Sequence, residues 1–477
     1  MNQKKIKAAS FAVALTLLPA HAFADSFKSR IERIMNNPCL NRAKVCLQVK
    51  SLNNGQVYYQ KNPDELLVPA SNMKIITAAT ALKTLKPWYK FDTIFSHTGE
   101  RKGEVLDGDL VITGQGDPHI GTEDLWGMSN EIRRRGIRQI KGNIVLDDGY
   151  FDGEAFPPGW RISSIRKAYE APGGALSLNF NTVTVIVTPP ASSGARPTVS
   201  VDPQSPYFTI VNNMNTVSRG RTFVAIRMKR RPDGGEILEV IGKVRPGARE
   251  SAYFRSVADP VLYFGHTFIE MLKNAGVTVN GQIVHSQASK PSKKIFVHSS
   301  RPLILQVMDM NKFSNNFMAE QILKTIGAEE VSSPGTIGKG VYVVERLLHS
   351  WGLINRFHIV DGSGLSKENR LTCSLLTDVL EKMYKEWEGG PEFITSLAVM
   401  GKEGSVRKRR LSATEPIRVK TGTLDAVSAL SGYYPLENGE VLGFSMIFNN
   451  LGCYHGMAQH IQNRLILEFE TVHNDER

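Results

Sequence analysis

The stretch that most constrains the fold lies at residues 68–82 and reads VPASNMKIITAATAL. Drawn as a helix, the segment behind Ser71 is apolar around almost its whole circumference. Such a helix has no face to present to water, so other elements must surround it. We therefore predict a central, buried helix that begins near Ser71 and stops before Pro87.

A lysine stands at the head of this helix, where Ser71 and Lys74 share one helical face because they are three residues apart. Burial disfavours the charged ammonium and lowers the pKa of a lysine from about 10.4. A neutral amine could then take the proton of the serine hydroxyl and activate it. The alternative is that Ser71 caps the helix and Lys74 extends to solvent. Ser-x-x-Lys alone is a weak motif and does not separate the two interpretations.

Two further motifs follow in the chain. Ser314-Asn315-Asn316 lies in MNKFSNNFMAEQIL, and Lys420-Thr421-Gly422 lies in PIRVKTGTLDAVSALSGYY. Ser-x-x-Lys, Ser-Asp-Asn and Lys-Thr-Gly form the set found in penicillin-recognising enzymes, although the middle residue of the second motif is Asn here. The β-branched residues that precede Lys420 predict a strand. Gly422 in this strand would allow a substrate strand to come close.

The two ends of the chain frame a β-rich block. Strand patterns around Asn-Gly turns predict one hairpin over residues 43–61 and another from VSALSGYYP and VLGFSMIFN. Residues 92–250 contain short β runs broken by Gly, Asp and Pro, with a seam at 189–197. Helical spacing is found at residues 260–275, 301–326, 338–351 and 455–470. We expect the end pieces to form one α/β domain around an antiparallel sheet, with the β-rich block spliced into it.

Residues 1–24 have the basic start, short apolar run and small final residues of a secretory signal peptide. We expect cleavage after Ala24 and a periplasmic mature protein. Disulfides are then permitted, but four cysteines allow three pairings, and Cys39 and Cys46 are close enough for a local loop. The cysteines are Cys39, Cys46, Cys373 and Cys453.

The formal net charge is +12. A surplus of this size favours a polyanionic neighbour, which for a secreted protein means anionic cell-wall polymer or a membrane surface rather than nucleic acid. Solubility alone is the other interpretation. The densest basic runs are RMKRR (227–231) and RKRR (407–410), and we expect both in solvated loops.

Together, the motifs resemble those of class C low-molecular-mass penicillin-binding proteins, which are serine D-alanyl-D-alanine carboxypeptidases and endopeptidases. The resemblance extends over the mature chain and includes VDGSGLSKENRLT (360–372), MGKEGSVRKR (400–409) and YEAPGGALSLNFNTVTV (169–185). Members of this family carry large inserted domains between the first two motifs. In this sequence the corresponding residues, Ser71 and Ser314, are 243 positions apart. The resemblance implies a β-lactamase-like α/β transpeptidase fold, with a five-stranded antiparallel sheet, flanking helices and β-rich inserted domains.

The implied division of the chain has four parts. Residues 1–24 form the signal peptide, and residues 25–92 with 297–477 form a discontinuous catalytic domain. Inserted domain II comprises 93–188 and 247–296, and inserted domain III comprises 189–246.

The resemblance also implies roles. Ser71 would be acylated, Lys74 would be the general base, Ser314 would relay a proton to the leaving nitrogen, and Asn316 would hold the substrate amide and orient Lys74. Lys420 and Thr421 would bind the terminal carboxylate, and the N–H groups of Ser71 and Thr423 would form the oxyanion hole. The remaining substrate-binding positions are Gly422, Thr423, Tyr169 as an aromatic wall, and Lys367.

Two positions depart from the family pattern. Ser164 stands where similar proteins have an acidic residue, and Lys367 stands where they tend to have arginine. Both positions are associated with gripping the amino-acid side chain of the stem peptide. We therefore expect looser or shifted selectivity at the diaminopimelate end.

The resemblance thus implies a serine D,D-peptidase that acts on peptidoglycan stem peptides and crosslinks, with endopeptidase activity expected first by analogy. β-Lactams would acylate Ser71, and neither a cofactor, a metal nor nucleic acid is expected. The alternatives are a β-lactamase-like hydrolase and a catalytically silent scaffold that binds the cell wall. A peripheral association with membrane or wall through the basic surface is a further expectation.

Overall fold

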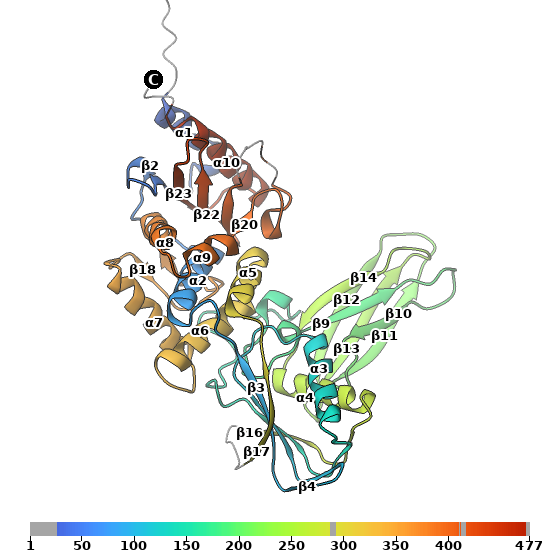
Figure 1. The fold of residues 1–477 in the computed structure, drawn as a ribbon. Coiled ribbons are helices and arrows are strands. Elements are labelled where there is room, and N and C mark those ends of the chain that lie inside the picture. The colour runs from blue at the N-terminus through green and yellow to red at the C-terminus, as the bar shows by residue number, and fades with distance from the viewer. Residues whose placement is uncertain (1–25, 287–291, 410, 412–415, 474–477) are drawn as a thin grey trace, which may run out of the picture.

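The computed structural model describes residues 26–286, 292–409, 411 and 416–473. The predicted signal peptide lies outside these residues. Figure 1 shows a unit formed by both ends of the chain, from which an inserted part descends and then turns outward as a separate arm. Among the described residues, no helix is both long and apolar enough to cross a bilayer.

One antiparallel sheet organises the unit formed by the chain ends. Its order is β2-β1-β23-β22-β21-β20, so the N-terminal hairpin pairs with the C-terminal strands through β1 and β23. Both predicted hairpins are confirmed. The expected five strands are present, and the short β20 makes a sixth. The strands are β1 (Lys44–Ser51), β2 (Val57–Lys61), β20 (Ala398–Val399), β21 (Arg418–Leu424), β22 (Val427–Pro435) and β23 (Val441–Asn449).

Helices cover both faces of this sheet, which is why β22 and β23 are buried along almost their whole length instead of alternating between buried and exposed. Leu47, Phe444 and Met446 face a core shared with α1 (Phe27–Met35) and α10 (His455–Glu468). Cys46 and Ile447 face the opposite core. The helices on that side are α2 (Met73–Thr84), α5 (Leu303–Phe313), α6 (Asn316–Glu330), α7 (Ile337–Ser350), α8 (Cys373–Lys385) and α9 (Gly390–Ser396).

Helix α2 lies inside this second core, as the sequence predicts. Every residue from Met73 to Leu82 is buried, including Lys74. The helix ends at Thr84, before Pro87, and packs on α5, α6, α7 and α8. Its N-terminus continues from a 3-10 turn, η2 (Ala70–Asn72), that carries Ser71.

The inserted part begins with a five-stranded sheet of order β16-β8-β6-β3-β17 and a four-stranded sheet of order β15-β7-β5-β4. Helices α3 (Thr122–Arg134) and α4 (Pro260–Asn274) pack together. The strands are β3 (Asp92–His97), β4 (Glu100–Lys102), β5 (Val105–Asp107), β6 (Leu110–Gly114), β7 (Gln139–Ile140), β8 (Ile144–Asp147), β15 (Thr278–Val279), β16 (Ile283–Ser286) and β17 (Lys293–Ser299).

The arm consists of two three-stranded sheets, β10-β9-β14 and β11-β13-β12. Its inner face joins the core of the preceding sheets through α4, where Phe264 and Phe268 are fully buried. The run RMKRR is not in a loop, because residues 227–230 belong to strand β12. The strands are β9 (Thr182–Thr188), β10 (Thr198–Asp202), β11 (Phe208–Thr216), β12 (Phe223–Arg230), β13 (Glu236–Val244) and β14 (Ser251–Ser256).

Strands β9 and β14 lie just outside the predicted domain III, yet β9 pairs with β10 on one side and with β14 on the other in one sheet. We propose to place the boundaries of domain III outside β9 and β14, and to keep the rest of the predicted division.

Two disulfides join distant parts of the chain. Cys39 pairs with Cys453, and Cys46 in β1 pairs with Cys373 at the start of α8. The local loop between Cys39 and Cys46 is therefore not formed. Both bonds connect the N-terminal segment to the C-terminal segment of the same unit.

Candidate active site

Lys74 is the centre of a buried hydrogen-bond cluster. Its Nζ donates to Ser71 Oγ at 3.1 Å, to Asn316 Oδ1 at 2.7 Å and to the carbonyl of Ser363 at 2.7 Å. Burial lowers the pKa of Lys74 to about 7, against the opposing effect of the negative charges of Glu320 and Asp361. The amine therefore changes its charge near neutral pH while it contacts the serine hydroxyl.

A break between α5 and α6 positions the second motif. Helix α5 ends at Phe313, and its C-cap residue, Ser314, adopts the left-handed conformation with φ 57°. Asn315 then caps α6 by accepting a hydrogen bond from the N–H of Met318. The break turns Ser314 toward the third motif and places Asn316 at the start of α6, against Lys74. The Nδ2 of Asn316 also donates to the carbonyl of Tyr169 at 3.0 Å, which ties the inserted part to the cluster.

Strand β21 carries the third motif. Lys420 is buried, and its Nζ donates to Ser314 Oγ and to the carbonyl of Thr421, both at 2.9 Å. Burial, together with the charge of Lys74, lowers the pKa of Lys420 well below its usual range. The hydroxyl of Thr421 is 2.9 Å from that of Ser405.

Gly422 lies close to another segment of the chain. A Cβ at this position would lie 2.7 Å from the carbonyl oxygen of Pro69 and 3.1 Å from Cβ of Ala70. The segment before Ser71 therefore passes close to β21 at this position. Gly422 allows the first and third motifs to lie side by side.

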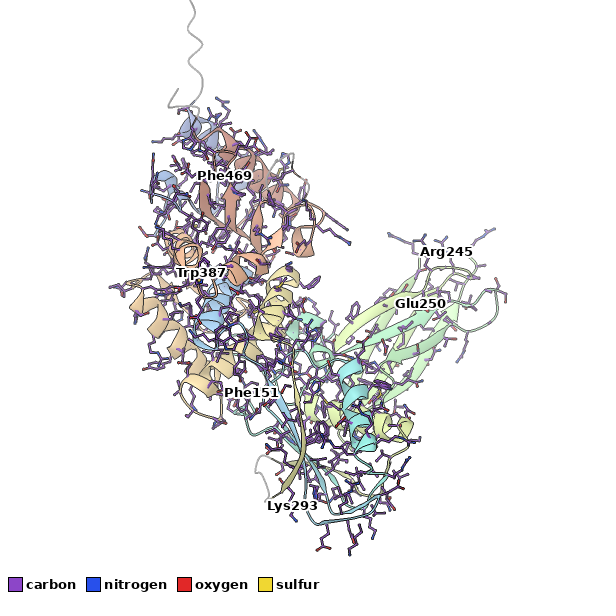
Figure 2. The ribbon with its side chains drawn as sticks, in the orientation of Figure 1. Phe151, Arg245, Glu250, Lys293, Trp387 and Phe469 are labelled. Atoms are coloured by element: carbon purple, nitrogen blue, oxygen red, sulfur yellow. A yellow bond between two sulfur atoms is a disulfide. The ribbon has the colours of Figure 1, made fainter. Side chains whose placement is uncertain are left out.

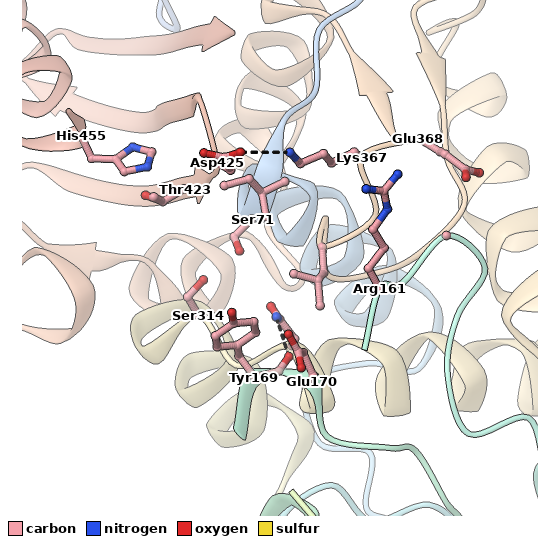
Figure 3. A pocket seen from close by; sticks show the side chains of 14 residues that line it. Ser71, Arg161, Tyr169, Glu170, Ser314, Lys367, Glu368, Thr423, Asp425 and His455 are labelled. Atoms are coloured by element: carbon pink, nitrogen blue, oxygen red, sulfur yellow. Dashed lines mark hydrogen bonds and ion pairs between the residues drawn. The ribbon is translucent and has the colours of Figure 1, made fainter. Parts of the chain in front are cut away.

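An open cavity of about 630 Å³ lies in front of Ser71 (Figure 3). Tyr169 forms part of its wall with its side chain half exposed, and Lys367 lies across the opening, 3.9 Å from Asp425. Arg161 points into the same space, whereas Ser164 is exposed and does not line it. The lining residues are Ser71, Gly159, Arg161, Tyr169, Glu170, Ser314, Asn316, Leu365, Lys367, Glu368, Thr423, Leu424, Asp425 and His455.

The structure thus brings together all ten residues that the sequence singled out. Six of them line the cavity, Lys74 and Lys420 lie behind it and contact lining residues, and Thr421 contacts Ser405. Gly422 supports the wall from strand β21. Within the described part of the chain, no group of three His, Cys, Asp or Glu side chains could hold a metal ion.

Two buried carboxyl groups behind Lys74 were missed by sequence reasoning. Glu320 accepts hydrogen bonds from the N–H groups of Gly362 and Ser363, at 3.0 and 2.8 Å. Asp361 accepts from the N–H groups of Gly364 and Ser366, each at 2.7 Å. Together they fix the loop whose Ser363 carbonyl holds Lys74. The one available signal was that Glu320 follows Asn316 by four residues and therefore shares its helical face.

Asp361 also connects the two parts of the molecule. Besides the two backbone groups it accepts from the Nδ2 of Asn369 at 2.8 Å and from the indole Nε1 of Trp160 at 3.0 Å. Trp160 belongs to the inserted part and immediately precedes Arg161. The same carboxylate therefore supports the loop behind Lys74 and the cavity wall that carries Arg161.

The antiparallel sheet, with a serine and a buried lysine at the head of the central helix, defines the class of penicillin-recognising serine enzymes. More specifically, residues 27–468 match the model of the D-Ala-D-Ala carboxypeptidase 3 (S13) family, and the chain belongs to this family. The resemblance to class C low-molecular-mass penicillin-binding proteins is thereby confirmed.

Individual relatives agree with this assignment. The chain is 32% identical over 462 residues to a D-alanyl-D-alanine carboxypeptidase of an Actinomadura species, which covers 91% of this chain and 84% of that protein. It is 22% identical to the D-alanyl-D-alanine carboxypeptidase DacB of Haemophilus influenzae, covering 94% of both. The crystal structure of penicillin binding protein 4 from the same organism superimposes with a TM-score of 0.80, at 20% identity and 93% coverage of this chain.

Proposed function

We propose that this protein is a periplasmic serine D,D-peptidase that hydrolyses peptidoglycan stem peptides through an acyl-enzyme on Ser71. The observation that carries the proposal is the position of Lys74, whose buried amine touches the serine hydroxyl and titrates near neutral pH. A neutral amine in this position can accept the hydroxyl proton without a histidine. The family relationship and the carboxypeptidase names of the relatives support this chemistry.

The reaction would proceed in two stages. Ser71 Oγ attacks the carbonyl carbon of the penultimate D-alanine while its proton passes to Lys74. The N–H groups of Ser71 and Thr423 stabilise the charge on the carbonyl oxygen, which appears only in the tetrahedral intermediate. The C–N bond then breaks, and the leaving nitrogen receives a proton through Ser314. Water finally attacks the ester, which releases the shortened peptide and restores the Ser71 hydroxyl.

Lys420 and Thr421 would bind the terminal carboxylate of the substrate. Lys420 Nζ already contacts Ser314 Oγ, so a bound carboxylate would lie next to the proton relay. Because burial and the charge of Lys74 disfavour the ammonium form of Lys420, a carboxylate at this point would favour that form again. Substrate binding and the charge of Lys420 would therefore be coupled.

We assign both carboxypeptidase and endopeptidase activity to the site. The cavity continues beyond Ser71 to Arg161 and Glu368 and has the volume of sites that bind drug-sized ligands. It can therefore accept a leaving group larger than one D-alanine. β-Lactams would acylate the same serine, and a β-lactam complex is known for the structurally similar Haemophilus influenzae protein.

Intact mass measurement after incubation with penicillin tests the proposal and its two alternatives. We expect a stable adduct on the wild-type protein and none on Ser71→Ala, together with cleavage of crosslinked muropeptides by the wild type. An adduct that decays quickly with high turnover would indicate a β-lactamase-like hydrolase. No adduct on the wild-type protein would indicate a silent scaffold and would overturn the proposal.

The rate of acylation should depend on pH through Lys74. Only the neutral amine accepts a proton, so the rate should rise with pH and reach half of its maximum near pH 7. The ionised carboxylate of Glu320 favours the charged form of Lys74, although burial also raises the pKa of Glu320 itself. Glu320→Gln should therefore shift the midpoint to lower pH. The second-order rate constant for penicillin acylation between pH 5 and 9 measures this, with Glu330→Gln on the same helix as a control that leaves the midpoint unchanged.

Selectivity should depend on Arg161 more than on Ser164, because Arg161 lines the cavity. A charge-assisted hydrogen bond from an arginine to a carboxylate contributes enough to change binding about tenfold. We expect Arg161→Ala to lower kcat/KM about tenfold for peptides with a free carboxylate on the diaminopimelate side chain, relative to amidated peptides. Ser164→Asp should change this ratio less. The expectation fails if Arg161→Ala leaves the ratio at its wild-type value.

A further inference from the structure

The free end of the arm is built from three loops that belong to different hairpins or connections. Residues 189–197, 217–222 and 245–250 meet there, and backbone hydrogen bonds join them. The N–H of Gly247 donates to the carbonyl of Pro190 at 2.9 Å, and the N–H of Val217 donates to that of Val244 at 3.0 Å. Arg245 lies at this end of the arm in Figure 2, far from the unit formed by the chain ends.

Five arginines lie on these three loops, and we call them the arginine tip: Arg196, Arg219, Arg221, Arg245 and Arg249. All five are exposed, and none takes part in an ion pair among the described residues. The acidic residue of the loops, Glu250, accepts a hydrogen bond from Thr188. From Thr182 to Ser256 the arm has eleven Lys and Arg against five Asp and Glu. The arm therefore carries half of the net charge of +12 of the whole chain.

An exposed aromatic residue accompanies the arginines. Phe223 begins strand β12 two residues after Arg221, and 58% of its surface is exposed. Its strand neighbours alternate, so Ile226 faces the core while Arg227 and Lys229 face outward with Phe223. Phe223 is paired with Lys243 on β13. Cationic side chains next to an exposed aromatic ring are the combination that favours the headgroup region of a membrane.

We propose that the arginine tip binds a membrane surface rich in anionic phospholipid. The planar guanidinium groups can each bind phosphate oxygens with two hydrogen bonds, and the loop ends present several of them together. Phe223 would insert at the level of the headgroups. The tip is the free end of the arm, so this contact would leave the cavity in front of Ser71 open to peptidoglycan. This inference does not depend on the proposed catalytic function.

Cosedimentation with vesicles tests the proposal. The mature protein should bind vesicles of phosphatidylcholine with about a third phosphatidylglycerol, and should bind pure phosphatidylcholine far more weakly. Each arginine removed should weaken binding about fivefold, so Arg219→Ser with Arg245→Ser should weaken it about 25-fold. Raising the salt concentration to 1 M should release the protein, because it shortens the Debye screening length to about 3 Å. Phe223→Ser should weaken binding at every salt concentration at which the wild-type protein binds.

A matched control removes two positive charges elsewhere. Lys102→Ser with Lys273→Ser loses the same charge from well-exposed side chains of the inserted part, outside the tip. This variant should keep nearly all vesicle binding, and penicillin acylation should report that both variants are folded. The proposal would be overturned if the two variants lost vesicle binding equally. It would also be overturned if the tip variant bound vesicles as tightly as the wild type. It would also be overturned if the tip variant lost binding to isolated peptidoglycan sacculi while the wild type never bound vesicles.

Discussion

Replacing Lys74 by arginine should lower the rate of acylation by penicillin about 10²–10⁴-fold, although it preserves the positive charge. Arginine stays protonated at every accessible pH, so it cannot accept the proton of the Ser71 hydroxyl. The site also has no room to keep a guanidinium in the place of Nζ, because three oxygen atoms lie within 3.1 Å of that atom. Stopped-flow acylation with a fluorescent penicillin measures the rate.

A second variant separates loss of the base from distortion of the site. Lys74→Met removes the amine but retains a flexible side chain of similar length, and a buried charge no longer has to be accommodated. Its acylation should be as slow as that of Lys74→Arg, while its thermal stability should equal or exceed that of the wild type. Wild-type acylation in either variant would exclude Lys74 as the base.

Asp361→Ala should lower the free energy of unfolding by about 3–5 kcal/mol. The Asp361 carboxylate is fully buried and accepts four hydrogen bonds at 2.7–3.0 Å, from Gly364, Ser366, Asn369 and Trp160. Its loss leaves the buried N–H groups of Gly364 and Ser366 without this acceptor and removes one hydrogen bond each from Asn369 and Trp160. The loop that ends at the Ser363 carbonyl would also lose its support, so acylation should slow with stability. Urea denaturation followed by tryptophan fluorescence measures the change.

Two comparisons make this result specific. Trp160→Phe removes one of the four hydrogen bonds and should cost about 1 kcal/mol. Asp425→Ala removes an aspartate whose side chain is 94% exposed, and it should change stability by less than about 0.5 kcal/mol. If Asp361→Ala were as mild as Asp425→Ala, the carboxylate would not be the support that its contacts indicate.

Local patterns predicted the elements that carry the three motifs. The segment after Ser71 is apolar around its circumference, which predicted a buried helix. The hairpins near the two ends of the chain were predicted from their Asn-Gly turns. These sequence patterns are local. They are stronger because the sheet is buried on both faces, which favours apolar residues at most strand positions. RMKRR was wrongly expected in a loop, because Arg227 and Lys229 occupy the outward positions of β12 and conceal its alternation.

The support behind Lys74 could not be predicted in the same way. Glu320 and the loop at residues 361–363 are about forty positions apart and meet only after α6 and α7 have packed. The close packing of Gly422 against the Pro69 carbonyl was not predicted, because tertiary packing brings that segment to β21. Ser164 was chosen by counting along the chain, whereas the cavity is lined by Arg161.

The entry and exit of the inserted part have a consequence for the order in which the molecule folds. Asp92 at the start of β3 pairs with Ser299 at the end of β17, so the insertion begins and ends at adjacent positions. Once these strands pair, Ser71 and Ser314 are separated by a connection of about forty residues instead of 243. The entropic cost of bringing them together falls by about 1.5 kcal/mol. The insertion, although it interrupts the catalytic domain, thereby shortens the loop that the domain must close.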